Sequence, residues 1–205
     1  MTVVSLVPKA PGPKDLPRVI ASSTAPAHPA PADPQLFRQA LRQLAGGVSV
    51  VTTGRGAART GLVATSVSSL SAEPPTLMFG LNLASSSFPV LRAHGAFAVN
   101  LLAADQKPIA DRFAGRGGEK GLARYAEASW TEGASGSALL DGALANLDCE
   151  IEELIERHSH AIVIGRIREI RIGSESAALL YWRGAYERLG WLPDEAASAL
   201  GLRAY

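Results

Sequence analysis

Hydrophobic and polar positions alternate in short runs along most of the chain, which is the period typical of β-strands. From Leu147 to Glu152, for example, apolar residues alternate with acidic ones, which predicts one apolar and one polar face. Seven runs are candidate strands: Val48–Thr53, Leu62–Leu70, Thr76–Leu81, Phe97–Leu102, Leu139–Glu153, Ala161–Ile172 and Leu179–Tyr186. We expect the last of these runs to close the sheet.

Helical periodicity is confined to a few segments. Asp33-Pro34 is a helix-start signal, and Phe37, Ala40, Leu41 and Leu44 follow at helical spacing. A short helix is expected after Pro89, and another, capped by Asp105, carries Ile109, Ala110 and Phe113. Many short strands with few helices favour a mainly β barrel with peripheral α-helices. The absence of a βαβ rhythm and of a G-x-G-x-x-G motif argues against a Rossmann dinucleotide site.

The two ends of the chain differ from its middle. Residues 1–32 hold seven of the 13 prolines and have no hydrophobic periodicity, so we expect a disordered Pro/Ala-rich tail. Residues 33–190 are expected to form one folded domain. Residues 191–205 would be a C-terminal extension, with a helix from Asp194 to Leu202.

Composition narrows the possible partners. The chain has 205 residues, 47% of them hydrophobic, and a formal charge of +1, so neither nucleic acid nor a membrane surface is an expected partner. The single cysteine, Cys149, lies in an apolar alternation and is expected to be a buried thiol. We find no signal peptide or spanning segment in the sequence and expect a cytoplasmic protein.

The segment from Gly61 to Asn82 is rich in small hydroxyl residues: Thr65, Ser66, Ser68 and Ser69. Short side chains let a planar ligand approach the backbone, whose N–H and C=O groups can bond a ring such as the isoalloxazine of a flavin. The three serines Ser85, Ser86 and Ser87 precede a short helix, and free N–H groups at a helix start can bind phosphate. An ordinary serine-rich helix cap would give the same pattern.

Five motifs in this order resemble those of the short-chain flavin reductases: Leu44–Thr53, Ala64–Pro75, Phe97–Asn100, Arg112–Gly115 and Leu180–Tyr186. The resemblance covers about residues 37–189. It implies an FMN-binding split β-barrel of the Greek-key type, as in the reductase components of two-component flavin monooxygenases.

The resemblance also implies roles for particular residues. The residues implied to contact the isoalloxazine are Thr65, Ser66, Val67, Ser68 and Ser69. Those implied to lie towards the ribityl phosphate are Asn82, Ser86 and Ser87. Arg112 would lie near the phosphate or adenylate end. Each has a simpler alternative: Arg112 as a surface ion-pair residue, and Ser68 or Ser69 as strand residues that face water.

One motif departs from the family pattern. Where the family often has Gly-Asp-His, this chain has His158, Ser159 and His160. His160 keeps the position of the histidine that helps to hold nicotinamide, although a structural hydrogen bond is the alternative. The lost aspartate weakens the case for nicotinamide more than the case for flavin.

The function implied by the resemblance is hydride transfer from NADH or NADPH, with nicotinamide C4 stacked over N5 of FMN or FAD. The protein would align the rings, exclude water and stabilise charge near flavin N1 and C2=O, without a general base or a metal. A homodimer and a separate monooxygenase partner are implied as well. Two alternatives stay open: a flavoenzyme with tightly bound FMN that oxidises its own substrate, and a non-catalytic module that binds flavin or serves haem degradation.

Overall fold

The computed structural model describes residues 31–190, and contacts along the chain divide it into residues 1–37 and residues 38–205. The account below concerns the second unit, apart from the start of the first helix. The predicted tail, except for its last two residues, and the predicted C-terminal extension with its helix lie outside the described residues.

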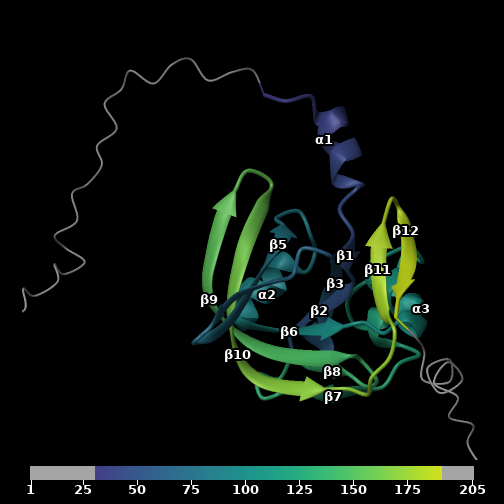
Figure 1. The fold of residues 1–205 in the computed structure, drawn as a ribbon. Coiled ribbons are helices and arrows are strands. Elements are labelled where there is room, and N and C mark those ends of the chain that lie inside the picture. The colour runs from purple at the N-terminus through teal and green to yellow at the C-terminus, as the bar shows by residue number, and fades with distance from the viewer. Residues whose placement is uncertain (1–30, 191–205) are drawn as a thin grey trace, which may run out of the picture. The chain divides into compact units, whose positions relative to one another are not determined.

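Twelve strands and six helical segments follow one another in the described part (Figure 1). Their bounds are α1 (Pro34–Leu41), β1 (Gly46–Gly47), β2 (Ser49–Thr53), η1 (Gly56–Ala58), β3 (Thr60–Ala64), β4 (Ser68–Ala72), β5 (Pro75–Asn82), α2 (Phe88–His94), β6 (Ala96–Leu101), η2 (Ala104–Gln106), α3 (Lys107–Phe113), η3 (Gly121–Tyr125), β7 (Trp130–Glu132), β8 (Ala138–Leu140), β9 (Ala145–Arg157), β10 (His160–Ile172), β11 (Ala178–Trp182) and β12 (Ala185–Leu189). The predicted mainly β class is confirmed.

The main sheet has seven antiparallel strands in the order β3-β2-β6-β9-β10-β5-β4. The two edge strands, β3 and β4, are separated in the chain by residues 65–67 alone. Three residues can span only about 10 Å, so the sheet must curl until its edges approach each other. The long strands β9 and β10 curve around the resulting barrel (Figure 1).

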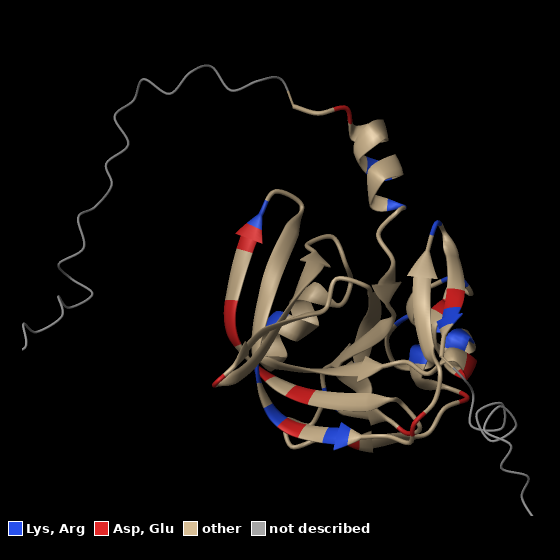
Figure 2. Ribbon diagram, viewed as in Figure 1, with Lys and Arg blue, Asp and Glu red and all other residues tan. Residues whose placement is uncertain are grey.

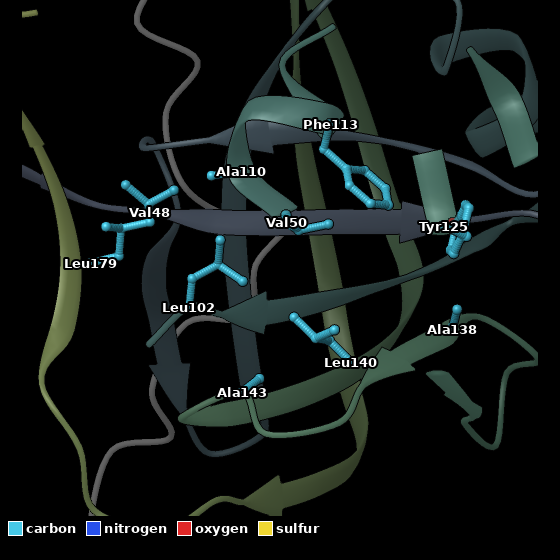
Figure 3. Close-up of a cluster of buried hydrophobic side chains, with 10 residues drawn as sticks. All are labelled: Val48, Val50, Leu102, Ala110, Phe113, Tyr125, Ala138, Leu140, Ala143 and Leu179. Carbon is cyan, nitrogen blue, oxygen red and sulfur yellow. The ribbon is translucent and has the colours of Figure 1, made fainter. Parts of the chain in front are cut away.

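Two hydrophobic clusters stabilise this barrel. The first lies inside the curled sheet and includes an edge-to-face contact between Phe79 and Phe97, whose ring centroids are 5.2 Å apart. The second gathers Val48, Val50, Phe113 and other side chains from α3, η3, β8 and β11 (Figure 3). Strand β2 lies between the two clusters, which explains why all five of its residues are buried.

Three predicted strands need correction. The run Leu62–Leu70 is two strands at opposite edges of the sheet, β3 and β4, and the run Leu139–Glu153 is β8 followed by β9. The run Leu179–Tyr186 does not close the main sheet, because β11 and β12 form a hairpin that pairs with β1 in a separate sheet. Alternation indicates the period of a strand but not the strand with which it pairs. The sequence pattern therefore showed neither the two interruptions nor the separate sheet.

Two further residues differ from expectation. Asp148 is fully buried rather than on a polar face, because the loop at Ser135 covers it and donates its backbone N–H at 2.6 Å and its hydroxyl at 2.5 Å. Asp105 lies in η2, and the helix that follows begins at Lys107. The predicted start of α1 is confirmed by a cap in which the Gln35 N–H donates to Asp33 at 2.6 Å.

No helix within residues 31–190 has the length and apolar character to cross a membrane.

Candidate active site

The segment that joins the two sheet edges, residues 65–67, is the centre of the site. Thr65 and Ser66 are exposed, and Val67 is half-buried. The Ser66 hydroxyl accepts from the Gly80 N–H at 3.0 Å, which fixes the segment against β5. A Cβ at Gly46 would lie 3.0 Å from the Thr65 Cβ, so glycine lets β1 approach this segment closely. Ser68 and Ser69 follow on β4 and are also exposed.

A cleft of about 450 Å³, here called the tyrosine cleft, opens beside Thr65. It is lined by Leu62, Val63, Thr65, Ser85, Phe113, Ala114, Arg116, Arg124, Tyr181 and Tyr186. The lining therefore combines an apolar floor, two hydroxyls, two guanidinium groups and two phenol rings. Among residues 31–190 no carboxylate lines it, so the cleft favours an anionic ligand with an aromatic part.

Neighbouring groups hold the charged and aromatic walls of the tyrosine cleft in place. Arg124 donates to the Gly61 carbonyl and, at 3.2 Å, to the Glu119 carbonyl. Arg116 lies 2.9 Å from an Asp111 oxygen and 5.1 Å from the ring centroid of Tyr186. Burial raises the pKa of Tyr186, although Arg116 opposes this, so the phenol keeps its proton at neutral pH and can donate a hydrogen bond.

Arg112 is not among the residues that line this cleft, although the next residue, Phe113, is. Its guanidinium donates to the Ala126 carbonyl and pairs with Glu127, and its side chain is 15% exposed. These contacts include the ion pair of the simpler alternative, although the Arg112 side chain is mostly buried and not a surface group. Arg116, four residues later, lines the cleft instead. The sequence signal for Arg116 was present in the charged glycine-rich loop after α3, but no spacing rule selects one arginine there.

The three serines before α2 do not lie as expected, because only Ser85 lines the cleft. Ser85 lines the tyrosine cleft, whereas Ser86 is exposed and outside the lining. Ser87 is fully buried, and its hydroxyl donates to the Gly61 carbonyl at 2.9 Å and lies 3.0 Å from the Thr60 hydroxyl. The Ser87 side chain therefore supports β3 and is not free to contact a ligand.

Asn82 and His160 lie opposite each other at the ends of β5 and β10. Asn82 accepts from the Ala84 N–H at 2.9 Å, and His160 Nδ1 is 2.9 Å from the Ser159 hydroxyl. Both are exposed on the outer face of the sheet. Since Ser66 bonds Gly80, two residues before Asn82, this pair lies about 7 Å along the strand from the joining segment.

The donor set fits a flavin. Guanidinium groups and a serine hydroxyl suit its phosphate, exposed hydroxyls beside open backbone suit the polar edge of its ring, and phenol rings suit its flat faces. Of the residues expected at the site, the structure brings Thr65 into the cleft and Ser66 beside it. Ser85, from the serine run singled out in the sequence, also lines the cleft, and the lining residues not expected from the sequence are Arg116, Arg124, Tyr181 and Tyr186.

Comparison with known proteins agrees with this chemistry. The family model for the flavin reductase like domain matches residues 41–190. The chain belongs to this family. Membership confirms the predicted enzyme class, a flavin reductase, and the split-barrel fold.

Individual relatives cover most of this flavin reductase. It is 34% identical over 155 residues to the FMN reductase (NADH) RutF of Cronobacter sakazakii. The matched region covers 76% of this chain and 92% of that protein. It is 35% identical over 155 residues to the 4-hydroxyphenylacetate 3-monooxygenase reductase component of Pseudomonas aeruginosa, with 76% and 91% covered. The solved NADH:FAD oxidoreductase SgcE6 of Streptomyces globisporus superimposes with a TM-score of 0.71 at 28% identity, over 81% of this chain and 99% of that one.

Proposed function

We propose that this flavin reductase transfers hydride from NADH or NADPH to FMN or FAD and supplies the reduced flavin to a separate monooxygenase. The observation that carries the proposal is the tyrosine cleft, where two guanidinium groups and, among the described residues 31–190, no carboxylate lie next to exposed hydroxyls. The names of the relatives support it, since they include NADH-dependent FMN reductases and reductase components of monooxygenases.

Each wall of the cleft has a task in this reaction. Reduced nicotinamide supplies the hydride and flavin accepts it. Arg116, Arg124 and Ser85 hold the flavin phosphate, and Thr65 with Ser66 bonds the polar edge of the ring. Tyr181 and Tyr186, in edge contact at 5.4 Å, exclude water from one side. Alignment and a dry site are sufficient, since hydride transfer needs no general base.

His160 stays a candidate to contact the nicotinamide, and Asn82 stays a candidate to contact the ribityl phosphate of the flavin. They share the outer face of the sheet with Ser68, and Ser69 follows on the same edge strand. The lost aspartate of the family motif leaves Ser159 as the partner of His160 Nδ1, and a neutral hydroxyl holds a ring less firmly than a carboxylate. A role for His160 in positioning nicotinamide is therefore part of the proposal.

A homodimer is also part of the proposal. Leu70, 49% exposed, follows Ser69 on β4, and Ile162, 40% exposed, pairs with Gly80, whose N–H donates to Ser66. A second copy would bury these side chains and close the open side of the site. Light scattering of the purified chain tests this, and a monomer at micromolar concentration would contradict it. A cytoplasmic location stays a prediction from the sequence.

The activity has a direct test. The purified full chain is mixed with NADH or NADPH and an excess of FMN or FAD, and the nicotinamide absorbance is followed. Steady loss that continues beyond one equivalent of protein is expected. No turnover with either nucleotide would remove the proposal. Flavin that stays bound through gel filtration and is never released reduced would favour an enzyme that acts on its own substrate.

A further inference from the structure

A second cleft, here called the arginine groove, adjoins the tyrosine cleft. Its volume is about 590 Å³, and Thr65 and Tyr181 line both clefts. Its lining consists of Arg38, Leu41, Arg42, Leu44, Gly46, Thr65, Ser66, Tyr181, Arg183 and Gly184. Thr65, with Ser66 next to it, therefore separates two ligand-sized spaces, and the candidate ring site is accessible from both.

The charge of the arginine groove is one-sided. Arg38, Arg42 and Arg183 line it, and within residues 31–190 no acidic side chain does. None of these three guanidinium groups forms an ion pair in the described part of the chain, where eight ion pairs engage other basic residues. All three arginines are exposed, and a groove lined by one sign of charge attracts anions.

The fold fixes two of these arginines before any ligand arrives. Arg183 donates to the Gln43 side chain at 3.0 and 2.7 Å, and Arg42 donates to the Arg183 carbonyl. The turn between β11 and β12 has φ values of 51° at Arg183 and 93° at Gly184. A Cβ at Gly184 would lie 2.9 Å from the Arg42 guanidinium, so glycine makes room for it. The basic hairpin tip is blue in Figure 2.

The rest of the lining suits a nucleoside. Leu41 and Leu44 are 49% and 70% exposed, which leaves apolar surface open at one side of the groove. Tyr181 adds an aromatic surface at the wall shared with the tyrosine cleft. A ligand with an anionic centre and aromatic ends would satisfy both the charge and the apolar surface.

We propose that the arginine groove binds the pyrophosphate of the reduced nicotinamide dinucleotide through Arg38, Arg42 and Arg183. The inference rests on the proposed function, because it needs a nicotinamide donor. It gives each phosphate its own cations: the flavin phosphate has Arg116 and Arg124, and the dinucleotide has the groove. The two reactants then meet at Thr65 from opposite sides, without competing for one anion site.

The sharpest variant is Arg38→Gln. Arg38 is exposed, and its guanidinium makes no hydrogen bond or ion pair with residues 31–190, so its loss should leave the fold unchanged. Isothermal titration calorimetry with NAD⁺ and the FMN-saturated protein should show a Kd that rises about tenfold, as expected for one charge-assisted phosphate contact. The matched control is Arg92→Gln, whose side chain is 67% exposed, 3.6 Å from Glu156 and in neither cleft. Its Kd for NAD⁺ should equal that of the wild type.

Kinetics give a second readout. Arg38→Gln should raise the KM for NADH about tenfold and leave the KM for FMN unchanged. The KM for NADH of the wild type should rise with salt, and less so in the variant. If the wild type does not turn over, the proposed function fails. If it turns over and Arg38→Gln has a wild-type Kd for NAD⁺ and KM for NADH, the groove is not the dinucleotide site. If Arg38→Gln leaves the Kd for NAD⁺ unchanged but alters the oligomeric state, the arginine groove is a contact between protein chains. That result would also overturn the inference.

Discussion

Two groups of small polar residues in this flavin reductase have opposite environments. Inside the fold, Asn100 and Thr52 are completely buried and Asn146 is 7% exposed. Their side chains bond one another and the backbone of β8: Asn100 accepts from the Leu140 N–H and from Asn146 at 2.8 Å, and Thr52 donates to Ala138 at 2.5 Å. At one sheet edge and in the segment that joins the edges, Thr65, Ser66, Ser68 and Ser69 are exposed. Among residues 31–190, Ser66 bonds Gly80 of β5 and the Ser68 hydroxyl donates to the Ser69 carbonyl.

This difference separates stability from function. A buried polar group must be paired, and removing one partner costs about 1–3 kcal/mol for each group left unsatisfied. An exposed hydroxyl is satisfied by water and can exchange that water for a ligand. We therefore expect substitutions in the interior group to unfold the protein, and substitutions at the edge to weaken ligand binding alone.

The largest effect is expected for Asn100→Ala. The change leaves the Leu140 N–H, the Val50 carbonyl and the Asn146 amide without this partner in a dry interior. The free energy of unfolding should fall by about 3–5 kcal/mol, measured by urea denaturation. Ser69→Ala is the matched edge variant and should change it by less than about 0.5 kcal/mol. Equal losses in both variants would contradict the comparison.

Arg116→Gln should act on binding. Loss of the proposed charge-assisted contact to the flavin phosphate should raise the KM for FMN about tenfold or more, with the KM for NADH unchanged. Its ion pair with Asp111 is half-exposed, so the unfolding free energy should change little. Steady-state kinetics in both substrates checks this result. A rise in the KM for NADH alone would mean that the tyrosine cleft binds the dinucleotide and the arginine groove binds the flavin.

Alkaline pH should weaken the interior while the edge stays unaffected. Burial, with a further contribution from Asp148, raises the pKa of the Cys149 thiol from 9.0 to about 12. The unfolded thiol ionises first, so stability is full below about pH 9 and falls towards pH 12, with about 1.4 kcal/mol lost at about pH 10. Urea denaturation measures this loss. Cys149→Ala should lack this component of the pH dependence, and an identical dependence in the variant would refute the assignment.

The smallest effect is expected for Thr65→Val. The change keeps the shape of the side chain and removes one hydroxyl from the wall between the two clefts. The KM for flavin should rise about fivefold, which corresponds to one neutral hydrogen bond of about 1 kcal/mol. The urea midpoint should be that of the wild type because Thr65 is exposed. A shifted midpoint with normal kinetics would place Thr65 in the structural group.

Much of the fold was predictable because alternation and helix caps are local signals. The strand from Thr76 to Leu81, the cap at Asp33 and the burial of Cys149 were each read correctly. The burial of Ser87 and Asp148 was not predictable. In both cases another segment, β3 or the loop at Ser135, covers a side chain that looks exposed in its own strand or loop.

The sequence by itself determined the class of the protein: short alternating strands, a hydroxyl-rich segment and motifs that place it among the flavin reductases. Only the tertiary structure decided which arginines line a cleft and which hydroxyls are exposed. Arg112 and Arg116 are four residues apart, yet one is held by Glu127 and the other lines the tyrosine cleft. The physical reason is that strand period and helix caps depend on neighbouring residues, whereas a cleft is formed by segments that meet only when the sheet has curled.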